Sequence, residues 1–120
     1  MIRGIKFTSI PVADQDRAIA FYTEKLGFRL LTDQPFSDTQ RWIELGIPGA
    51  ETRLVLFRFG DALKPGSQMN VTFWSGDVHA TAAELKSKGV EITMEPATQD
   101  WGTAAAFRDS EGNVFVLSSK

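Results

Sequence analysis

Hydrophobic and polar positions change their period several times along the chain, and each change marks an expected element. Residues 4–12 are rich in β-branched and aromatic side chains, which predicts a strand. Apolar residues then recur at helical spacing and predict a helix over 15–26. Asp14 stands where an N-cap acceptor belongs and Gly27 where a left-handed residue ends a helix. Strands are expected next at 28–34, 40–46 and 52–59.

The strand at 40–46 alternates between apolar and polar residues. Side chains of a strand point to opposite faces in turn, so Ile43 and Leu45 share one face. Trp42 and Glu44 share the other face. This strand is therefore expected to bury one face and to offer a ring and a carboxyl group on the other.

The same order of elements returns after a turn-rich stretch. A shift of 63 residues places Asp14 on Asp77, and Gly89 ends the second expected helix, 78–88, as Gly27 ends the first. The remaining strands of this half are expected at 68–75, 90–94, 101–108 and 113–118. The sequence therefore predicts one domain, 1–120, built of two βαβββ repeats, 1–60 and 68–120, with a linker at 61–67.

One helix and several strands in each half predict the α+β class. The expected architecture is a cup-shaped, mostly antiparallel sheet with both helices on its outer face. A sheet face too wide for a small core to fill becomes a hollow, and a ligand would bind in that hollow.

Composition narrows the possible partners. The chain has no cysteine, which excludes disulfides and sulfur-ligated metals and is compatible with a reducing cytoplasm, where we expect the protein. Acidic and basic residues are mixed and give a net charge of −2, so no nucleic-acid partner is expected. The amino terminus lacks the apolar core of a signal peptide, and no run is long enough to span a bilayer, so no membrane partner is expected.

Three segments resemble the vicinal oxygen chelate superfamily, which includes glyoxalase I, extradiol dioxygenases, and the bleomycin and fosfomycin resistance proteins. They are VADQDRAIAFYTEKLGF (12–28), DVHATAAELKSKGV (77–90) and WGTAAAFRDSEGNVFVL (101–117). The resemblance implies the paired βαβββ fold. It also implies a homodimer whose cup is shared with, or shaped by, the partner chain. The small residues Thr103–Ala106 would let another backbone or a ligand approach closely.

Catalytic members of that superfamily hold a divalent metal with His and Glu side chains at four inward strand positions. In this sequence those positions carry Phe7, Asn70, Val116 and either Leu54 or Val55, with Arg53 beside the last two. None of these four side chains offers an imidazole or a carboxylate, so we expect no metal and no cofactor. The only histidine, His79, is expected on the solvent side of the second helix.

The resemblance and strand parity together predict a set of inward side chains. They are Phe7, Ser9, Trp42, Asn70, Thr72, Trp74, Trp101, Phe107, Val114 and Val116. Rings with a few hydroxyl and amide groups suit a flat or aromatic organic ligand. The competing interpretation is that these rings are core residues that fill the cup themselves.

Glu44 is the one acid that we nominate as a catalytic proton acceptor. In a cavity that excludes water, a carboxylate beside Trp42 would have its ionised form disfavoured. The alternative is a salt bridge from Glu44 to Arg53 or Arg58 on the neighbouring strand.

Three functions remain open at this point. The first is a metal-independent protein that binds a partly aromatic small molecule and sequesters or detoxifies it. The second is a lyase, isomerase or dioxygenase of the same superfamily that acts on a small organic substrate. The third is a dimeric structural or regulatory module.

Overall fold

A computed structural model describes residues 1–68 and 70–120 of the chain. The first repeat contains β1 (Phe7–Pro11), α1 (Gln15–Ala20), a π-helical turn (Phe21–Lys25), β2 (Arg29–Pro35), β3 (Arg41–Gly46) and β4 (Arg53–Phe57). A short 3₁₀ helix (Gly60–Ala62) follows. The second repeat contains β5 (Thr72–Trp74), α2 (Val78–Ser87), β6 (Glu91–Gln99), β7 (Gly102–Arg108) and β8 (Val114–Ser118).

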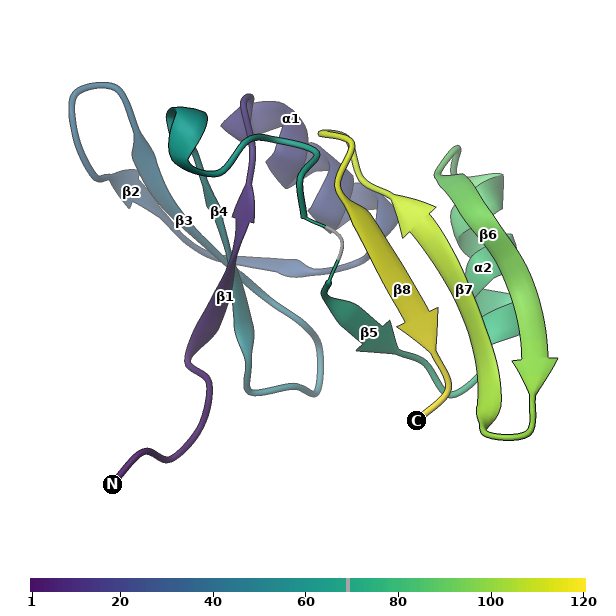
Figure 1. Ribbon diagram of the computed structural model, residues 1–120. Coiled ribbons are helices and arrows are strands. Elements are labelled where there is room, and N and C mark those ends of the chain that lie inside the picture. The colour runs from purple at the N-terminus through teal and green to yellow at the C-terminus, as the bar shows by residue number, and fades with distance from the viewer. Residues whose placement is uncertain (69) are drawn as a thin grey trace.

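Each repeat forms its own four-stranded sheet, and the two sheets have the same topology (Figure 1). The strand order is β1-β4-β3-β2 in the first sheet and β5-β8-β7-β6 in the second. The pairs β1–β4 and β5–β8 are parallel, and the other pairs are antiparallel. The predicted α+β class and the predicted βαβββ repeat are confirmed.

Local signals in the sequence place both helices. Asp14 accepts a hydrogen bond from the backbone N–H of Arg17, and Asp77 accepts one from that of Ala80, both at 3.0 Å. Gly27 and Gly89 have φ of +74° and +84°, the left-handed conformation that ends a helix at little cost only for glycine. The predicted caps and stops are therefore confirmed.

All the predicted strands are present with shifted bounds, and the strands predicted at 4–12 and 52–59 are shorter, Phe7–Pro11 and Arg53–Phe57. Three more differences occur in the second repeat. Of the predicted strand 68–75, only Thr72–Trp74 is a strand, and residue 69 lies outside the described residues. The predicted strand 90–94 is longer and runs over Glu91–Gln99, because β6 is an edge strand and an edge tolerates Pro96. The strand predicted from 101 begins at Gly102, since Trp101 lies in the β6–β7 turn.

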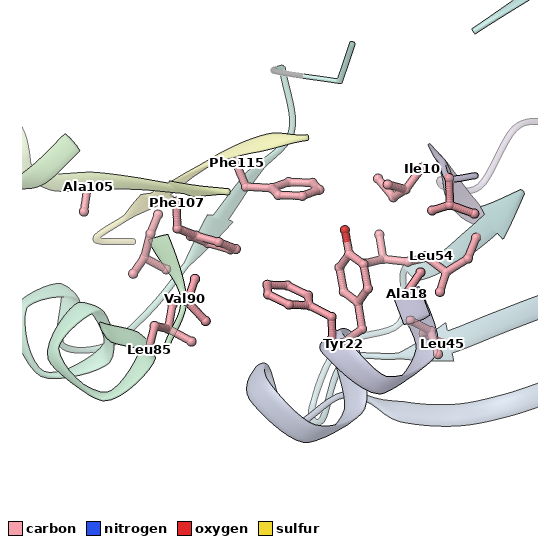
Figure 2. Packing of buried hydrophobic residues seen from close by; sticks show 14 of the residues in the cluster. Ile10, Ala18, Tyr22, Leu45, Leu54, Leu85, Val90, Ala105, Phe107 and Phe115 are labelled. Carbon is pink, nitrogen blue, oxygen red and sulfur yellow. The ribbon is translucent and has the colours of Figure 1, made fainter. Parts of the chain in front are cut away.

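Both sheets bury the face that meets the helices, and the two cores join at the centre of the molecule (Figure 2). Leu45 and Leu54 lie beneath α1, and Phe107 and Phe115 lie beneath α2. Tyr22 connects the two groups, with its ring centre 6.3 Å from that of Phe115. Apolar packing across the centre therefore holds the repeats together.

A buried network of hydrogen bonds centred on Asn113, which we call the Asn113 network, reinforces this junction. The Asn113 side-chain amide donates to Pro11 O at 2.9 Å and to Asp109 Oδ2 at 3.0 Å. Its oxygen accepts from the backbone N–H groups of Gly66 at 2.9 Å and Gln68 at 3.2 Å. An asparagine side chain has two donors and two lone pairs, so all its capacity is used. Asn113 thus ties the last turn to β1 and to the linker.

Asp109 connects the same turn to the first helix. Its Oδ1 accepts from the N–H groups of Glu111 at 2.8 Å and Asn113 at 2.9 Å, and its Oδ2 accepts from the Tyr22 hydroxyl at 2.6 Å. Gly112 has φ of +87° within this turn and packs against Gly66. The turn Asp109–Asn113, with the pattern D-x-x-G-N, therefore connects the two repeats through hydrogen bonds.

We predict that Asn113→Ala lowers the free energy of unfolding by about 3 kcal/mol, because it leaves the buried Pro11 O and the part-buried N–H groups of Gly66 and Gln68 without partners. Denaturant unfolding followed by circular dichroism measures this change. Asn70→Ala is the matched control, since Asn70 is exposed, and its stability should stay within about 0.5 kcal/mol of the parent. Equal stability of the two variants would contradict a stabilising role of the Asn113 network.

Tyr22 is the only tyrosine, so its ionisation can be followed directly. Burial, and next the nearby Asp109 carboxylate, raise the pKa of Tyr22 well above its ordinary value. The native state therefore keeps this proton more tightly than the unfolded chain. The stability that results is fully present below pH about 10 and falls as pH rises above it.

We predict that no tyrosinate absorbance appears in the native protein near the ordinary tyrosine pKa, and that it rises only together with loss of the circular dichroism signal. A stepwise alkaline titration with both detectors checks this. A reversible tyrosinate signal at the ordinary pKa in folded protein would contradict the buried Tyr22–Asp109 contact.

Candidate functional site

The face of the first sheet that points away from α1 carries the residues predicted there. We call it the first open face. Phe7 pairs with Arg53 and Ser9 pairs with Val55, and paired residues share a face. Glu44 also pairs with Val55, which places Glu44 and Trp42 on the same side as Ser9. Leu54 is 2% exposed in the core, so the strand register left open by the sequence puts Arg53 and Val55 on this face.

Five aromatic rings gather on the first open face. We call them the aromatic cluster: Phe7, Phe36, Trp42, Phe57 and Phe59. The Trp42 ring centre lies 5.5 Å from that of Phe7, and 5.7 Å from those of Phe36 and Phe57. Phe36 is 60% exposed, so the cluster is not sealed inside the core. A continuous surface of rings therefore faces outward from this sheet.

Glu44 sits between the aromatic cluster and a cation. Trp42 Nε1 donates to Glu44 Oε2 at 2.8 Å, and Arg53 Nη1 donates to Glu44 Oε1 at 3.0 Å. The hydrogen bond from Trp42, followed by that from Arg53, holds the pKa of Glu44 below its usual range. The expectation that its surroundings disfavour the ionised form is therefore wrong. The alternative, a salt bridge to Arg53, is confirmed.

The second sheet has an open face of a different character. Thr72 pairs with Val116, and Val116 pairs with Ala106, so these three share a face. Trp74 lies on the same face, 61% exposed, with Lys120 Nζ 4.6 Å from its ring centre. This second open face therefore combines small and branched side chains with Met94, Arg108 and one exposed indole.

Three predicted site residues lie elsewhere. Phe107 is 2% exposed and faces α2 with Phe73 and Phe115, because the even-numbered residues of β7 occupy the open face. Trp101 is 66% exposed at the tip of the β6–β7 hairpin. Asn70 lies before β5, where its backbone N–H donates to the Gln68 side chain at 2.7 Å. Their placement on an inward strand face is therefore corrected.

Sequence reasoning did not include three rings of the aromatic cluster. Phe57 and Phe59 have the same parity as Arg53 and Val55 in the predicted strand 52–59, and that alternation was a usable signal. Phe36 lies in the β2–β3 connection, where strand parity gives no signal. Its position depends on the turn that returns the chain to Trp42.

The described residues hold no group of three or more His, Asp or Glu side chains placed to bind a metal ion. His79 is exposed on α2, as expected. Within residues 1–68 and 70–120, no helix is long and apolar enough to cross a membrane.

Known proteins share both the sequence and the fold. YetH, an uncharacterised protein of Bacillus subtilis (strain 168), is 38% identical over 120 residues, which is 98% of each chain. TnmS3, an antibiotic binding protein from Streptomyces sp. CB03234, matches with a TM-score of 0.90 and 38% identity, over 98% of this chain and 96% of that chain.

A second solved structure shares the fold of this chain. It is a superfamily member from Sphaerobacter thermophilus DSM 20745, with a TM-score of 0.91 and 29% identity, over 99% of this chain and 98% of that chain. The sequence profile of the same superfamily matches residues 4–117. The chain therefore belongs to the Glyoxalase/Bleomycin resistance protein/Dioxygenase superfamily.

Proposed function

We propose that this protein binds a small, partly aromatic organic molecule without a metal ion and sequesters or detoxifies it. The observation that carries the proposal is the aromatic cluster, whose outward rings stand beside the Glu44–Arg53 ion pair. Exposed rings in contact with one another offer flat surfaces for stacking, and a few fixed polar groups orient the ligand.

The two open faces supply complementary walls for such a ligand. Phe36 and Trp42 lie 30° from parallel and present ring faces on the first sheet. The methyl groups of Ala106 and Val116 add apolar surface on the second sheet. A planar molecule held between them would bury both of its faces. The similarity to TnmS3, described as antibiotic binding, supports a ligand of this kind.

The ion pair favours binding over catalysis. A carboxylate whose pKa is lowered is a weak proton acceptor, because a general base works best with a pKa near the working pH. Glu44 fixed by Trp42 and Arg53 is better suited to orient a polar group of the ligand. The second function, a lyase, isomerase or dioxygenase with Glu44 as its catalytic base, has weaker support for this reason.

We predict that Trp42→Ala weakens the binding of an aromatic ligand at least about tenfold, since it removes a stacking ring and a donor to Glu44. A thermal-shift screen over aromatic antibiotics identifies a ligand through a raised melting temperature, and calorimetry then measures its Kd. His79→Ala, on the exposed side of α2, is the control and should keep the parent Kd. Unchanged affinity in Trp42→Ala would overturn the proposed site.

We further propose a homodimer in which the first open face of one copy meets the second open face of its partner. One exposed ring on each face, Phe36 on the first and Trp74 on the second, supports a covering surface. In such a dimer each cup takes one wall from each chain. The third function, a purely structural or regulatory dimer, predicts dimers that bind no ligand.

Mixing two inactive variants tests the shared cup. Trp42→Ala and Trp74→Ala each damage a different wall, so each homodimer should bind poorly. In the mixed dimer one cup carries both substitutions and the other carries neither, so half of its sites should bind, which is about a quarter of all sites in an equimolar mixture that pairs at random. Sedimentation equilibrium establishes the dimer, and calorimetry on the refolded mixture counts the sites. Absence of any recovery in a mixture shown to contain mixed dimers would contradict the shared cup.

A further inference from the structure

A cavity of about 540 Å³ lies at the seam between the two repeats. We call it the seam cavity. Thr8, Phe28 and Leu54 line it from the first repeat, and Phe73, Thr81 and Leu85 line it from the second. Thr8 and Leu54 are paired on the core face of the first sheet, and each is flanked in sequence by residues of the open face. The seam cavity is therefore on the opposite side of that sheet from the aromatic cluster.

The lining of the seam cavity is uncharged. Among the described residues that line it, none is acidic or basic. Its apolar walls include Phe28 and Phe73, whose ring centres are 5.7 Å apart. A charged molecule would lose its hydration there without gaining a partner, so the lining selects against ions.

A small number of hydroxyl groups give the seam cavity its polar character. Ser75 and Thr81 form a hydrogen bond of 2.7 Å at the cavity wall, and the Ser75 hydroxyl also accepts from the backbone N–H of Asp77 at 3.1 Å. Thr8 and Thr52 add hydroxyl groups from the first repeat. These groups suit a neutral molecule with one or two carbonyl or hydroxyl functions.

We propose that the seam cavity is a second binding site, selective for an uncharged, largely apolar small molecule. Its volume falls within the range of about 300–1,000 Å³ found for small-molecule sites. The pocket is partly open to solvent, since Ala50, Thr72 and Trp74 are exposed in its lining, and an apolar occupant would remove its apolar walls from water. The walls come from both repeats, so an occupant also stabilises their junction. This inference stands apart from the aromatic cluster, whereas Thr72 and Trp74 line the seam cavity and also belong to the second open face of the proposed dimer.

The test uses the full chain and the uncharged fluorophore N-phenyl-1-naphthylamine. We expect saturable binding with enhanced fluorescence and a raised melting temperature. Ala50 is exposed in the β3–β4 loop and lines the cavity, so Ala50→Phe places a ring at its wall without replacing a core residue. Ala50→Phe should weaken probe binding at least about tenfold, whereas Trp42→Ala should leave it within about twofold.

A second filling variant, Thr52→Phe, acts from the residue just before β4 and keeps the test decisive if Ala50→Phe fails to fold. Circular dichroism identifies the folded variants. Three results would overturn the proposal: no saturable binding to the parent protein, unchanged binding in the folded filling variants, or loss of binding in Trp42→Ala. If the filling variants instead dissociate a dimer and the parent takes up no probe, a second copy occupies the cavity and the proposal is also overturned.

Discussion

One buried amide holds the two halves of the molecule in register. Asn113 uses its full hydrogen-bonding capacity on β1, the linker and Asp109, and Asp109 in turn receives the Tyr22 hydroxyl. Each sheet is complete within its own repeat, and in the described part of the chain no strand ladder joins them. The Asn113 network and the rings packed around Tyr22 therefore set the relative position of the two open faces. They also set the shape of the seam cavity between the halves.

Local signals in the sequence predicted the fold, and contacts between distant residues decided the site. Asp14, Asp77, Gly27 and Gly89 act within one helical turn, so their positions alone placed both helices. Phe107 was misplaced because its face depends on how β7 pairs with β8, and alternation alone does not fix which parity meets the helix. The pKa of Glu44 is lowered by the hydrogen bond from Trp42 and next by that from Arg53, nine residues away, and residue spacing alone does not show whether these side chains meet.

This chain shares the fold of catalytic superfamily members but differs from them at the positions of the metal ligands. Positions that hold metal ligands in catalytic members carry Phe7, Val55 and Val116 on the open faces of the two sheets. The same backbone positions that elsewhere direct imidazole and carboxylate groups at an ion here direct a ring and two branched alkyl groups. In the proposed function, shape and stacking replace coordination as the means of holding a molecule, which is why binding is the better supported function.

The equal strand order of the two sheets carries a consequence for how such proteins diverge. Because each repeat satisfies its own backbone hydrogen bonds, side chains on one open face can change without disturbing the ladder beneath the other. One repeat carries aromatic rings on its open face, whereas the other carries methyl-bearing side chains. The matching main-chain topology thus allows each wall to vary on its own, so a change of selectivity requires substitutions in one repeat only.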